Sequence, residues 1–377
     1  MKPIHILVLI LCAGYASVAS GQQPAGQCSN NWAEFHRGNM QRWNPCEKEL
    51  NVHNVGRLGL KWRYDAGRRG GVVSSPAVVN GVVYVGSLDG NVYALKASTY
   101  GKLWSYTTGG SVNSSPAVVN EVVYVGSDDG KVYALNANSG ANLWTYTTHG
   151  SVSSSPAVTD GVVYVGSTDH KIYALNARTG AKLWSYTTGN KVSSPPAVAD
   201  GVLYVGSTDH RIYALNARTG AKLWSYATGN TVASPAVADG VVYFGSEDNI
   251  VYALDARTGA KLWSYTTDGL VESSPAVANG VVYVVSSYLG VYALNARTGS
   301  ELWSSENGSP ADSSPAVANG VVYVGSQDDT VYALNALTGA LLWIYTTANQ
   351  VESSPVVANG VVYVGSDDGN VYAFGLK

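Results

Sequence analysis

The sequence has few of the residues that usually carry redox, metal or hydrolytic chemistry. Its 377 residues include three cysteines, six histidines and two methionines, and no two cysteines are adjacent or arranged as Cys-x-x-Cys-His. A haem-attachment motif is therefore missing, and the histidines form no metal-ligand or Ser/His/Asp pattern. Charged residues make up 13%, against roughly 25% in ordinary soluble domains. The net charge is only −3, which excludes a broad electrostatic surface for nucleic acid.

Long hydrophobic runs are also missing, and the longest one lies at the N-terminus. It extends from Ile4 to Leu11, after Lys2 and before a group of small residues. Because a membrane span needs about 20 apolar residues, this run is too short to be a transmembrane segment. We predict a signal peptide over residues 1–20, cut near Ala19, Ser20 or Gly21, and hence a periplasmic or secreted protein.

Two alternatives to a cleaved signal peptide remain open. The run may be read as a buried helix, or Cys12 as the site of a lipid anchor. The lipid anchor is disfavoured because Leu11 precedes the cysteine, where a small residue is expected.

After removal of the leader, Cys28 and Cys46 remain. An even pair in an exported chain predicts a disulfide, here closing a loop of 18 positions. By chain entropy such a bond contributes roughly 3 kcal/mol. We expect residues 21–59 to form an N-terminal strap held by this bond; the alternative is two free thiols.

What the sequence does have is glycine, tyrosine and tryptophan, in a repeating unit. It contains 42 Gly, 26 Tyr and 10 Trp, a composition that fits many short strands and tight turns. A proline preceded by serine (by Pro195 in one copy) recurs at steps of 39 or 40 residues, at Pro76, Pro116, Pro156, Pro196, Pro235, Pro275, Pro315 and Pro355. Eight copies of one unit at this period predict a repeat architecture.

Turn signals divide each copy into four strands. Asn-Gly or Asp-Gly follows the first strand, an Asp-containing turn follows the second, and Thr-Gly usually follows the third. The fourth strand carries the tryptophan, as in Lys182-Leu-Trp184. Four short antiparallel strands per 40 residues are typical of a propeller blade, so we predict an all-β, eight-bladed β-propeller over residues 60–377 with few helices.

The chain ends predict how the ring closes. The eighth copy stops after its third strand, at Val371–Lys377, and lacks a tryptophan strand. A spare one, residues 60–66 with Trp62, precedes the first copy. We expect it to complete the last blade, which leaves no open sheet edge. Seven blades would follow only if one copy were displaced.

The stretch from Ala174 to Trp184, Ala-Leu-Asn-Ala-Arg-Thr-Gly-Ala-Lys-Leu-Trp, resembles the tryptophan-docking repeat of the pyrroloquinoline quinone (PQQ) protein superfamily. The resemblance covers residues 60–377. It implies that the tryptophans pack between neighbouring blades over the small alanine of the repeat and are structural rather than catalytic. These are Trp62, Trp104, Trp144, Trp184, Trp224, Trp263, Trp303 and Trp343. Residues 32–62 look like the lead-in of secreted PQQ-repeat proteins.

The resemblance points to two functions of different classes. Quinoprotein alcohol dehydrogenases, including those acting on polyvinyl alcohol, hold PQQ and calcium on the propeller axis and carry long insertions and adjacent cysteines. This sequence has neither, and its repeat spacing stays at 39–40 residues. Assembly propellers of the BamB type share the repeat without a cofactor. We therefore favour a non-catalytic binding or assembly scaffold with no cofactor, and keep a PQQ- and calcium-dependent dehydrogenase as the alternative.

Residues that differ between copies are the candidates for a site. Three positions before the repeat proline, Glu272, Asp312 and Glu352 stand in consecutive copies, where three carboxylates would suit Ca²⁺ or a basic partner. The alternative is that they only keep the surface soluble. Tyr288 and Leu289 replace a turn motif, and Arg68 and Arg69 lengthen a connection, so these four residues are candidates for a partner contact. The alternatives are sequence drift in the sixth copy and a solvated linker. The expected partner is a protein or another envelope component, bound by a monomer.

Overall fold

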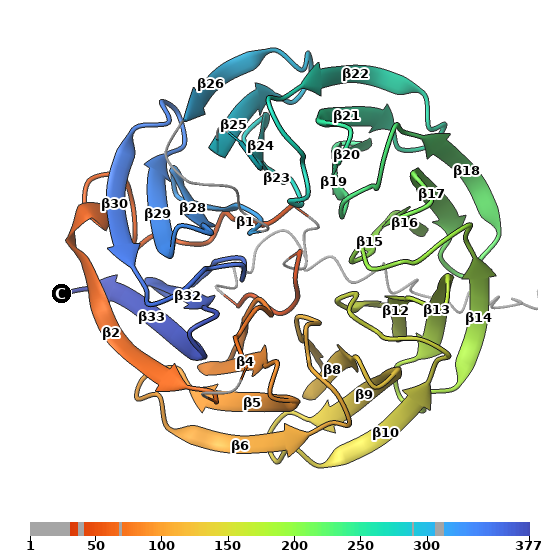
Figure 1. Ribbon diagram of the computed structural model, residues 1–377, viewed down its shortest axis with the longest axis horizontal. Coiled ribbons are helices and arrows are strands. Elements are labelled where there is room, and N and C mark those ends of the chain that lie inside the picture. The colour runs from red at the N-terminus through yellow and green to blue at the C-terminus, as the bar shows by residue number, and fades with distance from the viewer. Residues whose placement is uncertain (1–30, 37–40, 68–69, 289, 306–312) are drawn as a thin grey trace, which may run out of the picture.

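Eight β-sheets stand around a common axis and form a closed ring (Figure 1). In this computed structural model, residues 31–36, 41–67, 70–288, 290–305 and 313–377 are described. The predicted eight-bladed β-propeller is confirmed. Each blade has four antiparallel strands, A to D from the axis outward, and a fifth, short strand joins blade 7.

The blades follow the repeat in chain order. Their strands are, for blade 1, β3 (Ala77–Val79), β4 (Val82–Gly86), β5 (Asn91–Lys96) and β6 (Lys102–Thr107); for blade 2, β7 (Ala117–Val119), β8 (Val122–Ser127), β9 (Lys131–Asn136) and β10 (Asn142–Thr147); for blade 3, β11 (Ala157–Thr159), β12 (Val162–Ser167), β13 (Lys171–Asn176) and β14 (Lys182–Thr187); for blade 4, β15 (Ala197–Ala199), β16 (Val202–Ser207), β17 (Arg211–Asn216) and β18 (Lys222–Ala227). They continue, for blade 5, with β19 (Ala236–Ala238), β20 (Val241–Ser246), β21 (Ile250–Asp255) and β22 (Lys261–Thr266); for blade 6, with β23 (Ala276–Ala278), β24 (Val281–Ser286), β25 (Gly290–Asn295) and β26 (Glu301–Ser305); for blade 7, with β27 (Ala316–Ala318), β28 (Val321–Gly325), β29 (Thr330–Asn335) and β30 (Leu341–Thr346); and for blade 8, with β31 (Val356–Ala358), β32 (Val361–Gly365), β33 (Asn370–Leu376) and β2 (Leu58–Asp65).

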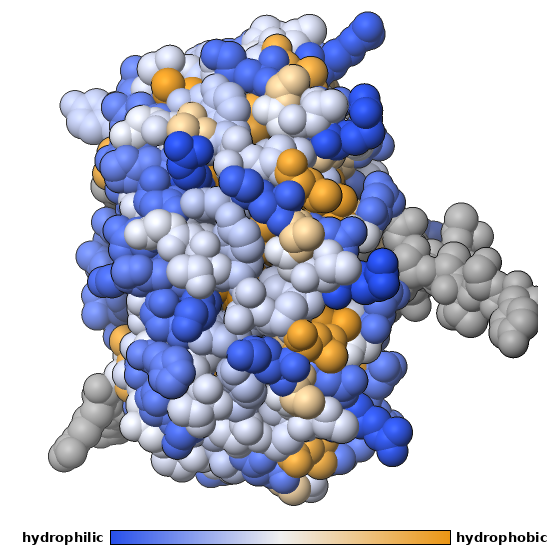
Figure 2. Space-filling model, turned by 90° about the vertical axis from the view of Figure 1, so that its right-hand side faces the viewer, coloured by the Kyte–Doolittle hydropathy of each residue, from blue (hydrophilic) through white to orange (hydrophobic). Residues whose placement is uncertain are grey.

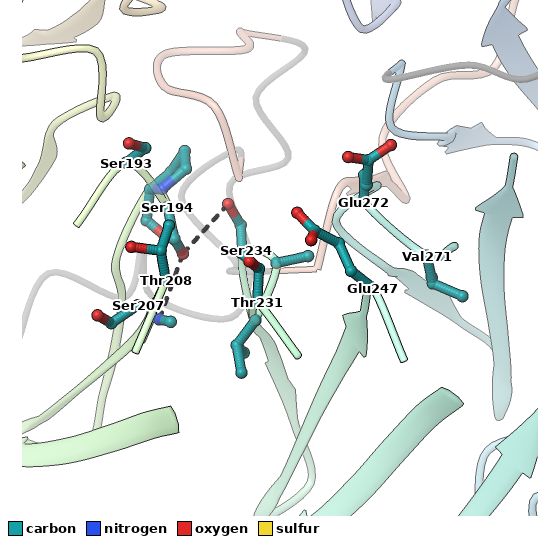
Figure 3. Close-up of a pocket in the computed structure, with 13 residues that line it drawn as sticks. Ser193, Ser194, Ser207, Thr208, Thr231, Ser234, Glu247, Val271 and Glu272 are labelled. Carbon is teal, nitrogen blue, oxygen red and sulfur yellow. Dashed lines mark hydrogen bonds between the residues drawn. The ribbon is translucent and has the colours of Figure 1, made fainter. Parts of the chain in front are cut away.

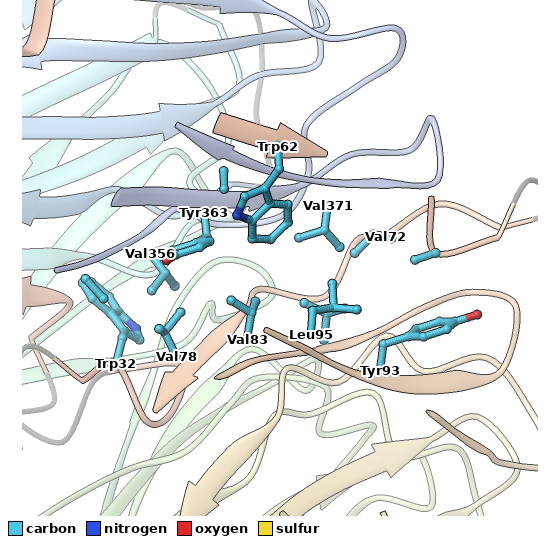
Figure 4. Packing of buried hydrophobic residues seen from close by; sticks show 14 of the residues in the cluster. Trp32, Trp62, Val72, Val78, Val83, Tyr93, Leu95, Val356, Tyr363 and Val371 are labelled. Carbon is cyan, nitrogen blue, oxygen red and sulfur yellow. The ribbon is translucent and has the colours of Figure 1, made fainter. Parts of the chain in front are cut away.

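The ring closes by pairing the two ends of the propeller. Strand β2 runs antiparallel to β33, with Leu58 opposite Leu376 and Trp62 opposite Ala373. The prediction for residues 60–66 is thus confirmed, and the strand begins two residues earlier. Trp62 packs beside Tyr363 with ring centroids 6.0 Å apart, in a buried cluster that joins blade 8 to blade 1 (Figure 4).

Each tryptophan of strand D reaches the next blade around the ring. The indole Nε1 of Trp104 donates to the carbonyl of Ala137, 2.8 Å away, and Trp144 does the same to Ala177. A glycine of the next blade's C–D turn lies under the indole: a Cβ on Gly180 would meet Trp144 at 2.7 Å. At the seam between blades 7 and 8 the chain ends replace that turn, and Trp343 donates to Leu58 instead.

The N-terminal segment enters the hub of the propeller. Backbone N–H groups of the axial strands A bond to it: Val78 to Trp32 O, Val118 to Ala33 O, Val277 to Gln41 O and Val317 to Arg42 O. Strand β1 (Trp43–Asn44) pairs in parallel with β27, and the Asn44 amide donates to Val357 O. A short 3-10 helix, η1 (Val55–Arg57), then leads to β2. The described part of the segment thus contacts the axial strands of several blades before it reaches the closing blade.

No helix in the described ranges is long and apolar enough to cross a membrane.

Candidate functional site

Acidic turns cluster on the face formed by the B–C and D–A connections. In seven blades a B–C aspartate accepts the hydroxyl of the tyrosine four residues later, as Asp129 does from Tyr133. Asp129 also accepts the N–H of Gly109 from the preceding D–A connection. Burial alone would raise the pKa of Asp129, but these hydrogen bonds outweigh burial and lower it. The role of these aspartates is therefore structural: their hydrogen bonds hold the turns together.

Blade 6 lacks this aspartate, because Tyr288 stands in its B–C turn. Asp268, from the preceding D–A connection, accepts the hydroxyl of Tyr292 at 2.9 Å instead. The structure thus replaces the missing carboxylate locally. The side chain of Tyr288 is 74% exposed.

A ring of serines joins neighbouring blades near the axis, at the residue before each repeat proline. Ser75 N–H donates to the hydroxyl of Ser115, 2.9 Å away, and Ser115 N–H to Ser155. The same bond links blades 6 to 7, 7 to 8 and 8 to 1. Among the described residues it is absent at the three junctions from blade 3 to blade 6.

Two sequence changes explain this interruption. Pro195 replaces the serine of blade 4 and has neither an N–H nor a hydroxyl. In blade 5 one residue is missing and Ala233 replaces a second serine, so the backbone of Ala233 bonds directly to Gly245 O. The described part of the strap also makes no backbone bond to strands A of blades 4 and 5.

A pocket of about 230 Å³ opens at this interruption, between blades 4, 5 and 6 (Figure 3). Its walls carry the hydroxyls of Ser193, Ser194, Ser207, Thr208, Thr231 and Ser234 and the carboxylates of Glu247 and Glu272. The two glutamates lie together on one side, with Ser193 and Thr208 opposite. None of the described residues that line the pocket is basic. Its chemistry suits a ligand that donates hydrogen bonds or carries positive charge.

The strap places three ionisable groups on the axis, where they are nearly inaccessible. Arg42 is fully buried, and its guanidinium donates to the carbonyls of Phe35, Pro315 and Pro355 at 2.6, 2.9 and 3.1 Å. Burial raises the pKa of Glu34 to about 7, although the N–H of Val158 bonds to its carboxylate. Burial, reinforced by the charge of Arg42, lowers the pKa of His36 to about 3.

The sequence-predicted acids fall at different places. Glu272 is an exposed wall of the pocket, and Glu352 is half-buried at the start of blade 8. Asp312 lies outside the described residues, so the three-carboxylate site stays a prediction. Sequence reasoning missed Glu247. Its position in the B–C turn varies from copy to copy, so the glutamate does not stand out in the sequence.

The remaining predicted residues are only partly described. Leu289, Arg68, Arg69 and Cys28 lie outside the described residues, and Cys46 is buried. The partner contact and the pairing of Cys28 with Cys46 therefore stay predictions.

Comparison with known protein families identifies the family of the chain. Residues 158–377, more than half of it, match the family described as the β-propeller of the beta-alanine-activating enzyme. Residues 53–191 match the family described as outer membrane protein assembly factor BamB. The chain belongs to the PQQ-like β-propellers. The predicted resemblance is thereby confirmed.

Curated relatives of this PQQ-like propeller match over short stretches. Lupanine 17-hydroxylase [cytochrome c] of a Pseudomonas species is 34% identical over 109 residues, 27% of this chain and 16% of the relative. The dehydrogenase subunit of a quinone-dependent alcohol dehydrogenase of Gluconobacter oxydans is 38% identical over 77 residues, 20% of this chain and 10% of the relative. The chain thus matches about a tenth to a sixth of the length of these relatives.

Solved structures share the fold over most of the chain. BamB of Moraxella catarrhalis superposes with a TM-score of 0.75 at 22% identity, covering 84% of this chain and 99% of that one. A europium-containing methanol dehydrogenase superposes with a TM-score of 0.79 at 16% identity, covering 92% and 98%. At these identities the likeness concerns the fold alone.

Proposed function

We propose that this PQQ-like propeller is an exported, non-catalytic scaffold that binds a partner through the face formed by its B–C and D–A connections. The observation that carries the proposal is the occupied hub. Trp32, Arg42 and Asn44 are completely buried on the axis. Because the strap fills the axis of the propeller, we expect a partner to bind at surfaces where the blades differ in sequence.

We propose that this scaffold works without a cofactor. No three His, Cys, Asp or Glu side chains in the described ranges are grouped so as to hold a metal ion. The described hub residues also do not fit PQQ, because the strap's side chains and backbone bonds fill the axis and the repeat leaves no insertions to enclose a ring system.

The pocket of Figure 3 is the contact we expect on this face. Two carboxylates and no basic wall residue favour a basic group of the partner, or a cation, over an anion. The match to BamB supports a protein partner in an assembly, since that relative is described as an assembly factor.

Capture from an envelope extract tests the scaffold. The immobilised protein should retain a partner that is lost when Glu247 and Glu272 are both changed to Gln. Glu121→Gln, an exposed glutamate in an A–B turn on the opposite face, is the matched control and should change nothing. Equal capture by all three proteins would contradict binding through the pocket.

A PQQ- and calcium-dependent dehydrogenase is the second candidate, favoured by the quinone-dependent alcohol dehydrogenases among the relatives. Purified protein is titrated with PQQ and Ca²⁺ and assayed for dye reduction with alcohols, including polyvinyl alcohol. Stoichiometric uptake with turnover would replace the scaffold by this enzyme.

A further inference from the structure

The outer rim of the propeller carries one half-exposed leucine per blade in blades 1 to 6. Their exposed fractions lie between 50% and 53%: Leu103, Leu143, Leu183, Leu223, Leu262 and Leu302. Each is the extra residue of a β-bulge in strand D. In blade 3, for example, Ala174 pairs with Trp184 and Leu175 with Lys182, so Leu183 has no partner and its side chain lies at the surface.

Blade 7 shows what can cover this position. Its equivalent, Leu342, is partly buried against Leu50, Val55 and Leu58 of the strap. The 3-10 helix η1 approaches so closely that a Cβ on Gly56 would lie 3.4 Å from Leu342 O. A short turn-and-helix segment with branched apolar side chains therefore fits against the leucine of strand D.

Charge distinguishes three of the uncovered blades from the covered one. In blades 3, 4 and 5 the residue before the leucine is lysine, and the C–D turn carries arginine. In blade 7 both positions are leucine, Leu341 and Leu337. We define the rim stripe as Leu183, Leu223 and Leu262 with Lys182, Lys222, Lys261, Arg178, Arg218 and Arg257. Figure 2 shows that side of the ring, where apolar side chains form a row with hydrophilic ones beside them.

The cations of the rim stripe are available to a ligand. All six are exposed, and none makes an ion pair with another residue of the described ranges. The acids of the same face, Asp160, Asp200 and Asp239, lie in A–B turns nearer the axis, and Asp255 is bonded to Thr258. Six cations beside three half-exposed leucines attract an acidic ligand that also has apolar groups.

We propose that the rim stripe binds a short acidic segment of a partner protein, whose leucine or valine side chains cover Leu183, Leu223 and Leu262 as the strap covers Leu342. The proposal adds a second surface to the proposed scaffold role and uses none of the pocket residues. Its failure would leave the capture test on Glu247 and Glu272 unaffected.

The test uses two synthetic peptides and the full-length protein. One peptide has the sequence of residues 47–58; the other has Glu at the positions of Lys48 and Arg57. We expect the acidic peptide to bind more tightly, with an affinity that falls as salt is raised. Changing Lys182, Lys222 and Lys261 to Glu should weaken it by about tenfold or more, as three exposed charge contacts would allow. Changing Leu183, Leu223 and Leu262 to Ser should weaken it by a similar factor.

The matched control changes three leucines of equal exposure outside the stripe, Leu103, Leu143 and Leu302, to Ser. These should leave the affinity unchanged, and circular dichroism confirms that every variant is folded. No binding of the acidic peptide, or an equal loss in the control, would overturn the proposal. Lysine-dependent binding to anionic phospholipid vesicles in place of the peptide would also overturn it, in favour of a lipid surface.

Discussion

At the scale of single residues, six of the eight blade junctions place a tryptophan over a glycine. The sequence resemblance identified the tryptophans as structural, and the indole N–H bonds to the next blade agree with such a role. It gave the repeat alanine as the small residue facing the tryptophan and did not identify the turn glycine that lies beneath the indole. The turn glycine lies 36 residues further along, and its positive φ already accounts for its presence without any tryptophan.

Two glycines of blade 3 allow the need for a positive φ to be separated from the need for space under the indole. Gly180 and Gly161 have φ of 72° and 74°, but only at Gly180 would a Cβ clash with the indole, at 2.7 Å, since Gly161 has open space. We expect Gly161→Ala to cost about 1 kcal/mol for backbone strain. Gly180→Ala should cost about 1–3 kcal/mol more, because the junction is overpacked. Urea unfolding measures both, and equal losses would show that the indole can move aside.

The buried groups of the hub predict opposite pH effects. The raised pKa of Glu34 means that its contribution to stability is present below pH 4.5 and lost as the pH rises toward about 7. The lowered pKa of His36 means that its contribution is present above pH 6.5 and lost as the pH falls toward about 3. Between pH 4.5 and 6.5 the two effects oppose each other.

Single substitutions should therefore uncover a pH dependence that the parent protein hides. Between pH 4.5 and 6.5, Glu34→Gln should become more stable as the pH rises and His36→Gln less stable, each by up to about 1.4 kcal/mol per pH unit. Urea unfolding at three pH values in this window measures the slopes. Slopes of the same sign in the two variants would contradict the assignment.

At the scale of elements, the strands were predictable and the strap was not. Most strand boundaries follow from turn signals that recur along the chain, such as Asn-Gly or Asp-Gly in seven of the eight copies; in Asn80-Gly81 both φ angles are positive. Residues 31–58 have no repeat and no periodicity. Their partners lie far away in sequence, as for Asn44 and Val357, so local patterns carry no information about where the segment lies.

Arg42 holds the strap to the axis, and the geometry of its hydrogen bonds predicts the stability of a lysine variant. The guanidinium donates in three directions to carbonyls from the strap and from blades 7 and 8. A lysine keeps the charge but not the planar fork, and it leaves buried carbonyls without a donor. We expect Arg42→Lys to lose about 2–4 kcal/mol.

Thermal unfolding measures this loss. An exposed arginine of the rim, Arg178, provides the control, because Arg178→Lys should leave the midpoint unchanged. A midpoint for Arg42→Lys equal to that of the parent protein would mean that the strap does not depend on the fork.

At the scale of the whole molecule, the sequence predicted a ring of eight because the missing strand of one end is present at the other. It could not predict the candidate pocket. Near-identical copies suggest eight equivalent junctions, whereas Pro195 and the residue missing from blade 5 remove the serine bonds at three of them. Only the three-dimensional arrangement shows that these small changes fall side by side.

Blade 8, which closes the ring, should be the blade most sensitive to loss of its tryptophan. Trp62 and Trp104 are similarly buried, at 6% and 8% exposure, and each donates to an alanine carbonyl of the next blade. Strand β2, however, is joined to β33 without a turn. We expect Trp104→Ala to cost about 3–5 kcal/mol and Trp62→Ala to cost more, because blade 8 can then open. Hydrogen exchange should show early loss of protection in β2 only in the second variant; equal patterns would contradict this.

The strap also constrains the timing of folding in the cell. Its residues leave the ribosome before any blade exists, yet its bonds reach Val78 of the first blade and Val357 of the last. Native insertion therefore has to wait for the end of translation, and until then Trp32 and the buried charges of this segment stay exposed. The hub is therefore expected to be completed as one of the last steps of folding, which makes the N-terminal segment a natural point for a chaperone to bind.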